Sequence, residues 1–219
     1  MARISESTVR RLSHYYRVLE EVAAEGKRMI SSRRLAEREG ITSAQVRKDL
    51  SYFGSFGRRG LGYSVQHLRE EIGAILGLDR RWKVVVVGAG NIGSALLSYG
   101  GFAEQGFDVV AVFDQDPRRI GQRIGGFEVL DTAKLAELTR ARGADIGVIA
   151  TPARGAQAVA EALVAAGVRG ILNFAPRKLF VADDVPVRTV DMTMEFESLS
   201  FALTQARSPR RRRSGRDTA

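Results

Sequence analysis

Residues 82–93 read Trp-Lys-Val-Val-Val-Val-Gly-Ala-Gly-Asn-Ile-Gly, and this stretch decides the fold. The four consecutive valines, Val84–Val87, are typical of a strand that is buried on both faces of a parallel sheet. Three glycines, Gly88, Gly90 and Gly93, follow at once in the spacing G-x-G-x-x-G. A strand, a glycine turn and a helix in this order predict the first βαβ unit of an α/β domain.

The glycine turn also predicts a site for a dinucleotide. Glycines let the backbone approach a pyrophosphate closely, and a helix N-terminus supplies free N–H groups and a positive dipole end. Asp114 ends the next apolar run, where an acid binds the ribose of NAD(H) and repels the 2′-phosphate of NADP(H). Arg118 and Arg119 leave that preference open, and a glycine turn without a ligand is the alternative. The predicted contacts here are Gly88, Ala89, Gly90, Asn91, Ile92, Gly93 and Asp114.

Apolar runs alternate with helical stretches downstream of this unit. Residues 107–113, 146–150 and 170–174 are predicted strands, and residues 157–166 form a clear helical pattern. This alternation predicts a doubly wound parallel sheet of the Rossmann type. Residues 192–205 predict a further helix. Cofactor contacts are also predicted for Thr151 and Pro152.

The residues before the valine strand predict a helical domain with one glycine-rich hairpin. Helices are expected over residues 5–25, 32–39, about 43–53 and 65–76, with Thr42 and Gln45 as a capping box for the third. On that third helix, Val46, Leu50 and Phe53 share the inward face. The outward residues suit contacts with base edges and phosphates: Gln45, Arg47, Lys48, Ser51 and Tyr52.

The second and third helices together predict a helix-turn-helix, with the third as the recognition helix. The hairpin that follows, residues 54–63, carries Arg58 and Arg59 between glycines and predicts a wing that enters a minor groove. A solvated polar helix face and an ordinary surface turn are the alternatives. The order of helix-turn-helix and arginine hairpin favours binding to double-stranded DNA.

Charge and composition point the same way. The chain has a net charge of +9, distributed as +7 over residues 1–83, −3 over 84–206 and +5 over 207–219. Basic segments are typical of proteins that bind a polyanion.

The chain has no cysteine, and the sequence shows neither a long apolar run nor a secretory signal, so we expect no disulfide, no membrane span and a cytoplasmic location. No metal site is expected either.

Catalytic groups are sparse in the predicted cofactor domain. The two histidines, His14 and His67, both precede the valine strand. Hydride-transfer enzymes hold an acid or base near the nicotinamide. The sequence therefore favours sensing over turnover, with an NAD-dependent oxidoreductase that carries an accessory helical domain as the alternative. A further alternative is a constitutive DNA-binding protein whose cofactor domain serves only dimerisation.

These motifs closely resemble one family, the Rex redox-sensing transcriptional repressors of bacteria. The resemblance covers about residues 8–205, and its most specific stretches are residues 45–54, 59–63, 88–93 and 170–176. It implies a homodimer whose C-terminal helix swaps into the partner and lies between the partner's two domains. It also implies repression of genes for anaerobic or alternative NADH-oxidising metabolism, with release from DNA when NADH binds and NAD⁺ as a weaker competitor.

The resemblance also implies roles for single residues. Arg47, Lys48 and Arg59 match DNA contacts, and Phe174–Pro176 match a segment near the nicotinamide. A polar set that couples the two domains is matched by Arg17, Tyr99 and Asp191. Met192 stands where some members carry Phe.

The predicted organisation is an N-terminal winged helix-turn-helix domain (1–78), a Rossmann domain (79–191), a swapped helix (192–206) and a disordered basic tail (207–219). We hypothesise that an apolar pocket disfavours the cationic nicotinamide of NAD⁺, and that NADH binding changes the spacing of two recognition helices on a pseudo-palindromic operator. Asp191 is the candidate switch between Arg17 and Tyr99. The tail adds non-specific DNA affinity or, alternatively, only solubility.

Overall fold

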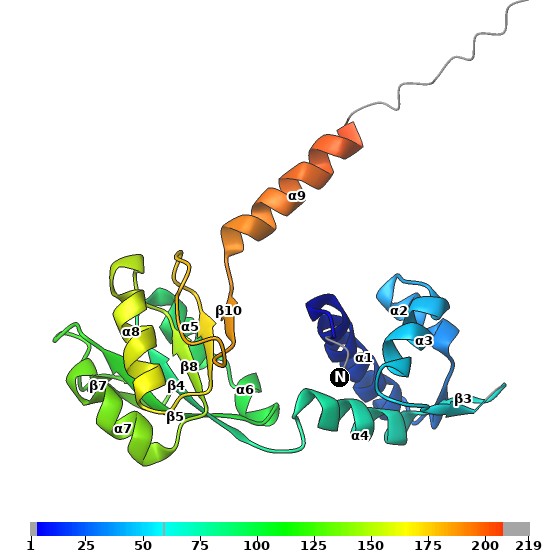
Figure 1. The fold of residues 1–219 in the computed structure, drawn as a ribbon, viewed down its shortest axis with the longest axis horizontal. Helices are drawn as coiled ribbons and strands as arrows, with labels where there is room; N and C mark the ends of the chain where they lie inside the picture. Colours follow the sequence, from blue (N-terminus) through cyan, green and yellow to red (C-terminus); the bar gives the residue numbers. More distant parts are fainter. Residues whose placement is uncertain (1–3, 59, 208–219) are drawn as a thin grey trace, which may run out of the picture. The chain divides into compact units, whose positions relative to one another are not determined.

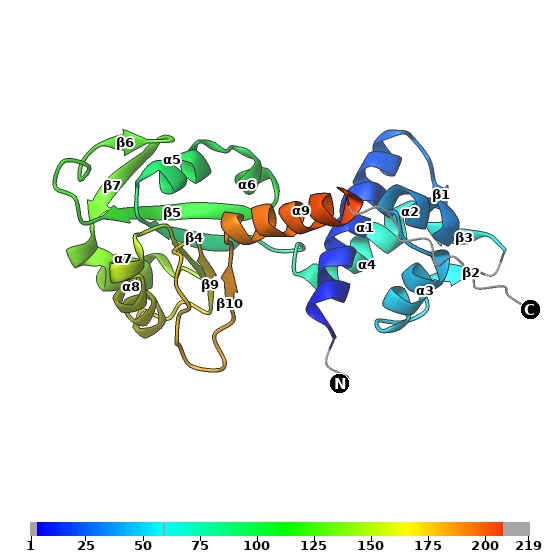
Figure 2. The same ribbon diagram turned by 90° about the horizontal axis from the view of Figure 1, so that it is seen from above.

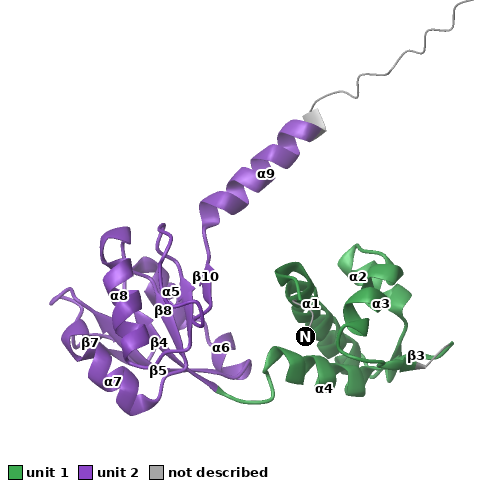
Figure 3. Ribbon diagram, viewed as in Figure 1, with its two compact units in different colours: residues 1–81 green, residues 82–219 purple. Residues whose placement is uncertain are grey.

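The computed structural model describes residues 4–58 and 60–207. The chain divides into two compact units, residues 1–81 and 82–219, which Figure 3 shows in separate colours. The predicted winged-helix section (1–78) falls in the first unit, and the predicted Rossmann section (79–191) falls in the second except for residues 79–81.

The first unit is helical and carries a small sheet of strand order β1-β3-β2. Both strand pairs of this sheet are antiparallel. Its elements, labelled in Figure 1, are α1 (Glu6–Ala24), β1 (Met29–Ile30), α2 (Ser32–Glu39), α3 (Ser43–Ser51), β2 (Gly57–Arg58), β3 (Gly62–Ser64) and α4 (Val65–Leu76).

Side-chain caps begin all four helices of this unit. The hydroxyls of Ser5, Ser31, Thr42 and Ser64 each accept a hydrogen bond from the backbone N–H three residues later. The predicted capping box is only half right, because Thr42 caps α3 but the Gln45 amide donates to Asp49 instead. The third helix also ends at Ser51, two residues earlier than predicted.

One apolar core joins the helices of the first unit. Val46 and Leu50 of α3 are buried and Phe53 packs against the same cluster, so their predicted inward face is confirmed. Its other large side chains come from α1, α2 and α4, from β1 and from the hairpin: Leu12, Tyr15, Leu19, Ile30, Leu35, Tyr63, Leu68 and Ile72.

The second unit is a seven-stranded sheet of order β10-β9-β8-β4-β5-β7-β6. Every pair is parallel except β6 with β7. The parallel strands therefore follow the order of a Rossmann fold, and the predicted parallel sheet is confirmed. The strands are β4 (Trp82–Val87), β5 (Phe107–Asp114), β6 (Arg123–Ile124), β7 (Phe127–Asp131), β8 (Ile146–Ile149), β9 (Gly170–Asn173) and β10 (Val187–Thr189).

Helices lie on both faces of this sheet, as Figure 2 shows. One core face joins the strands to α7 (Leu135–Arg142) and α8 (Ala153–Ala165). The opposite face packs against α5 (Asn91–Ser98), and α6 (Gly101–Glu104) follows α5. Helix α8 begins four residues earlier than predicted, because Pro152 fits the position just before a first helical turn.

The last described helix, α9 (Met192–Arg207), differs from the others in its burial. Every residue from Met192 to Gln205 is exposed, including six large apolar side chains. They are Met192, Met194, Phe196, Leu199, Phe201 and Leu203. None of the described helices has the length and apolarity that a membrane crossing requires.

We predict that the core of the first unit is sensitive to truncation while its hairpin tip is not. Leu19 is fully buried and Leu61 is 65% exposed, so the two leucines form a matched pair. Leu19→Ala should lower the free energy of unfolding by about 2–5 kcal/mol. Leu61→Ala should change it by less than about 0.5 kcal/mol. Urea unfolding followed by far-ultraviolet circular dichroism measures both, and equal effects would contradict the assigned core.

Candidate functional site

The glycine turn after β4 requires glycine because two strand ends approach each other there. Gly88 has φ +100°. A Cβ at this position would lie 2.5 Å from the carbonyl oxygen of Ala150, which follows β8. A Cβ at Gly93 would lie 1.9 Å from the carbonyl oxygen of Gly88. Both glycines are therefore fixed by packing within the protein, whereas a Cβ at Gly90 would meet no atom within 4 Å.

The open space at Gly90 lies at the start of α5. Gly90 is the N-cap of this helix, and no side chain caps it. Its free backbone N–H groups and its dipole make the turn suitable for a phosphate. Asn91 and Ile92 are exposed in the first turn, as a ligand contact requires, whereas the methyl group of Ala89 lies in the core and its backbone N–H and carbonyl are bonded within the protein.

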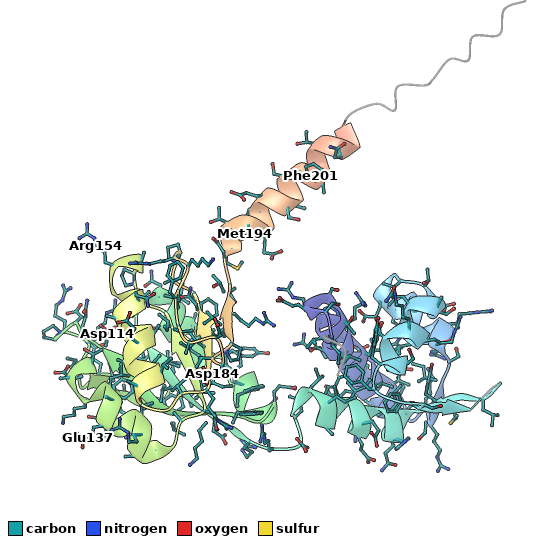
Figure 4. The ribbon with its side chains drawn as sticks, in the orientation of Figure 1. Asp114, Glu137, Arg154, Asp184, Met194 and Phe201 are labelled. Atoms are coloured by element: carbon teal, nitrogen blue, oxygen red, sulfur yellow. The ribbon has the colours of Figure 1, made fainter. Side chains whose placement is uncertain are left out.

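Asp114 lies at the end of β5, beside the glycine turn, and is labelled in Figure 4. Its Oδ2 accepts a hydrogen bond of 2.7 Å from the Ala89 N–H, and its Oδ1 accepts one of 2.9 Å from Asp116 N–H. A carboxylate has about four lone-pair directions, so Asp114 retains acceptor capacity for a ribose hydroxyl. Arg119 donates to the Ala89 carbonyl, while Arg118 is paired with Asp116.

Strand β8, which pairs with β4 on the side opposite β5, brings a second helix N-terminus to the same edge of the sheet. β4 and β8 are the neighbours between which the strand order reverses, and ligands of open α/β sheets bind at that point. Thr151 and Pro152 connect β8 to α8, and no side chain caps α8. The Thr151 hydroxyl is buried without a hydrogen-bond partner among the described residues. An orphaned hydroxyl at this place fits a site that is completed by a ligand.

The turn after β9 is held by Asn173, a residue whose role the sequence analysis missed. Asn173 is fully buried, and its amide donates to the carbonyls of Ala175 and Arg177 at 3.1 and 2.9 Å while its oxygen accepts from Ala175 N–H. The three predicted cofactor contacts in this turn differ in how far their side chains are buried. Phe174 is half-buried and Pro176 exposed, but the methyl group of Ala175 lies in the core. Any contact from Ala175 to a ligand is thus confined to its backbone.

The recognition helix α3 presents a polar face. Arg47, Lys48, Ser51 and Tyr52 are exposed, as predicted for readers of DNA. The Arg47 guanidinium donates to the Ser32 hydroxyl at 3.2 Å, which joins α3 to the start of α2. A cleft of about 660 Å³ lies between these helices and the hairpin. Its lining residues are Ser31, Ser32, Arg47, Leu50, Ser51, Gly54, Ser55, Phe56, Gly57, Gly60, Gly62 and Tyr63.

Gln45, also predicted as a reader, is held inside the unit by Asp49. The Asp49 side chain is fully buried and accepts from Gln45 Nε2 at 2.8 Å, from the Tyr15 hydroxyl at 2.8 Å and from two nitrogens of Arg11 at 2.6 and 2.8 Å. Burial opposes ionisation of Asp49, but these hydrogen bonds outweigh it and lower its pKa. Burial and the bond to Asp49 raise the pKa of Tyr15.

The hairpin has the form of a wing. Tyr63 of β3 packs over Gly57, where a Cβ would lie 2.8 Å from the tyrosine ring. Gly62 has φ +83°, and a Cβ there would lie 2.5 Å from the Ile30 carbonyl oxygen. Arg58 ends β2, whereas Arg59 lies outside the described residues.

The three predicted coupling residues lie on both units. Arg17 is exposed on α1, and Tyr99 is 62% exposed at the end of α5, edge-on to Phe102. Asp191 precedes α9, and its Oδ1 accepts a hydrogen bond of 2.9 Å from Thr193 N–H. Asp191 therefore caps α9. Within residues 4–58 and 60–207, no group of three His, Cys, Asp or Glu side chains is placed to hold a metal ion.

The fold and these sites define a class of protein, in which a winged helix-turn-helix unit is joined to a Rossmann unit with a nucleotide-type glycine turn. Two family profiles agree: "Putative DNA-binding protein N-terminus" matches residues 3–51, and "CoA binding domain" matches residues 79–177.

Individual relatives identify the family. The "Redox-sensing transcriptional repressor Rex" of Carboxydothermus hydrogenoformans is 53% identical over 91% of this chain and 96% of its own. "Redox-sensing transcriptional repressor Rex 1" of Thermotoga maritima is 46% identical over 94% of this chain and 99% of its own. The chain belongs to the Rex family, as its motifs predicted.

Solved structures of a Rex-family repressor named RSP have the same fold. RSP in complex with β-NAD⁺ and operator DNA matches with a TM-score of 0.89 and 37% identity, covering 94% of this chain and 95% of RSP. RSP in complex with β-NADH matches with a TM-score of 0.84 and 36% identity, covering 94% and 97%.

We predict that two glycines of the turn respond differently to the same substitution. Gly93→Ala should cost about 3 kcal/mol of stability without any ligand, because the new methyl group meets the backbone oxygen of Gly88. Gly90→Ala should cost less than about 1 kcal/mol. Urea unfolding measures both through the fluorescence of the single tryptophan, Trp82, which begins β4. Similar costs at the two positions would contradict the geometry of the turn.

Proposed function

We propose that this chain is a transcriptional repressor that binds operator DNA and is released when NADH binds its Rossmann unit. The observation that carries this proposal is the presence, in one chain, of an exposed basic recognition helix and a glycine turn with Asp114 at the sheet's switch point. The relatives are named repressors and RSP binds both NAD(H) and operator DNA, which supports a regulator rather than an enzyme. Such a repressor works in the cytoplasm, where the bacterial chromosome lies.

The residues at the switch point suit NAD(H) in three ways. The open N-termini of α5 and α8 offer N–H groups to phosphate or carboxamide oxygens. Asp114 suits the two ribose hydroxyls of NAD(H), and its charge opposes the 2′-phosphate of NADP(H). The orphaned Thr151 hydroxyl supplies a further hydrogen-bonding group at the same edge.

Discrimination between the two redox forms is assigned to the turn after β9. The nicotinamide ring is a cation when oxidised and uncharged when reduced. Phe174 and Pro176 offer apolar surface without a carboxylate among residues 173–178. Transfer of a cation to such surroundings costs free energy that the neutral ring does not lose. This difference in affinity is what allows NADH, with NAD⁺ as a weaker competitor, to shift a conformational equilibrium.

A homodimer is proposed from two apolar surfaces of the second unit. On α9, Met192, Phe196, Leu199 and Leu203 share one face, and Met194 and Phe201, labelled in Figure 4, lie about half a turn away. A helix that is apolar on opposite sides is typical of one buried between two surfaces. This pattern supports the swap of α9 into the partner, between its two domains.

The second surface is a cleft on the sheet face that α5 and α6 cover only in part. It has a volume of about 450 Å³ and an apolar wall from β4, β8 and β9 together with Leu96, Leu97 and Phe102. An open apolar cleft and an exposed apolar helix are both costly in water. The proposed dimer buries both in one assembly.

We predict that the dimer depends on the apolar stripe of α9. Leu199→Asp should convert the protein to a monomer of 24.0 kDa in sedimentation velocity runs, because it places a charge in the buried stripe. Glu197→Gln on the polar side of α9 is the matched control and should stay dimeric. A wild-type chain that sediments as a monomer, or a dimeric Leu199→Asp variant, would contradict the proposal.

The function itself is tested by DNA binding at fixed salt. A duplex is first selected by the wild-type chain from a randomised pool, and a pseudo-palindrome is expected because a two-fold dimer reads two half-sites about 34–36 Å apart. Saturating NADH should raise the dissociation constant for this duplex at least about tenfold, whereas equal NAD⁺ should leave it within about twofold. A DNA affinity that neither nucleotide changes would favour a constitutive DNA-binding protein. Steady consumption of NADH would favour an oxidoreductase.

Asp191 is proposed as the switch that pairs with Arg17 in one state and with Tyr99 in the other. Because Asp191 also caps α9, Asp191→Asn is the sharper variant, since asparagine caps a helix equally well but carries no charge. We predict that Asp191→Asn and Asp191→Ala keep their affinity for NADH, and that NADH then shifts their DNA affinity less than in the wild type. Unchanged release by NADH in both variants would remove Asp191 from the mechanism.

The basic tail after Arg207 lies outside the described residues. Its proposed contribution is non-specific and salt-dependent DNA affinity.

A further inference from the structure

The buried carboxylate of Asp49 is the one acidic side chain in α3, and its place is unusual for a recognition helix. A negative charge opposes approach to phosphates, yet here it is 0% exposed and turned away from the exposed Arg47 and Lys48. Among the described residues, three side chains donate hydrogen bonds to it: Arg11 and Tyr15 from α1, and Gln45 from α3 itself.

The interaction is directional in a way that the surrounding core is not. Val46 and Leu50 hold α3 through apolar contacts, which stabilise packing but tolerate small rotations of a helix about its axis. The Arg11 guanidinium binds both carboxylate oxygens of Asp49 at 2.6 and 2.8 Å, and such a two-pronged pair has a fixed planar geometry. The Tyr15 hydroxyl adds a third direction at 2.8 Å.

The same network reaches the start of α1. Arg11 also donates to the Thr8 hydroxyl at 3.2 Å, and the Thr8 hydroxyl lies 2.9 Å from that of the N-cap residue Ser5. Further along α1, Tyr16 packs against α4, where a Cβ on Gly73 would lie 3.2 Å from the tyrosine ring. Helix α1 is thus joined to α3 by hydrogen bonds and to α4 by close packing, and its exposed Arg17 belongs to the proposed switch.

We infer that Asp49 is a positioning residue for DNA recognition, which fixes the rotation of α3 on α1 so that Arg47, Lys48, Ser51 and Tyr52 face the bases in one register. The inference rests on the proposed function, because it concerns how specific DNA binding is achieved. Gln45, which the sequence predicts as a DNA contact, instead holds Asp49 in place. Any movement imposed on α1 is then carried to the recognition helix through this carboxylate.

The test uses variants that leave the net charge unchanged, because charge alone alters DNA affinity. Tyr15→Phe removes one donor, and Arg11→Lys keeps the positive charge but loses the two-pronged geometry. Tyr16→Phe, the neighbouring tyrosine on α1, is the matched control because it is not a donor to Asp49. The probes are the duplex selected by the wild-type chain and a scrambled duplex of the same composition.

The measured quantity is the ratio of the two DNA affinities in the full-length chain, with NADH affinity measured separately without DNA. Tyr15→Phe should lower the ratio about threefold and Arg11→Lys about tenfold, through loss of affinity for the selected duplex alone. The control should keep the wild-type ratio, and all variants should bind NADH normally. A partly unfolded variant loses both affinities together, so its ratio is preserved.

An unchanged ratio in both folded variants would overturn the inference and leave Asp49 with a purely stabilising role, even if the melting temperature falls. This result differs from failure of the proposed function. If the proposed function fails, the wild-type chain itself selects no duplex, or its DNA affinity does not change when NADH is added.

Discussion

The close approach of β4 and β8 at Gly88 is the constraint on which the second unit depends. Only a residue without a side chain permits the turn, because a Cβ would lie 2.5 Å from the carbonyl oxygen of Ala150. The approach sets two helix N-termini and the hydroxyl of Thr151 at one edge of the sheet. Asp114 then binds the Ala89 N–H and fixes the turn. The proposed site for NAD(H) therefore depends on a backbone packing requirement.

Each unit holds its candidate functional residues through a buried polar side chain. Asn173 shapes the turn that carries Phe174 and Pro176, and Asp49 holds α3 against α1. Apolar cores supply most of the stability in both units, but they leave orientation loosely set. The directional hydrogen bonds of these two side chains supply that orientation. The exposed apolar faces of α9 are the basis for the proposed second copy of the chain.

Local signals explain what the sequence could predict. The valine run, the glycine spacing and the inward stripe of Val46, Leu50 and Phe53 arise from contacts within one element and its neighbour, so the parallel sheet and the helix-turn-helix could be predicted. The edge strands β6 and β10 have only two and three residues, too few for a periodic pattern, and they were missed together with the five-residue strand β7. One sequence signal could have indicated the role of Asp49: it is an acidic residue on the inward face of the helix, between Val46 and Phe53. The swap of α9 and the spacing of two recognition helices stay predictions, because they are properties of a dimer.

The central claim is that the apolar surroundings of Phe174 and Pro176 favour the uncharged ring of NADH over the cation of NAD⁺. Calorimetric titration of the full-length chain with each nucleotide, in the absence of DNA and at one salt concentration, measures this preference directly. The account predicts that NADH binds at least about tenfold more tightly, a difference of about 1.4 kcal/mol. Equal affinity for the two forms would contradict it, because a ligand pair without differential affinity cannot report the redox state.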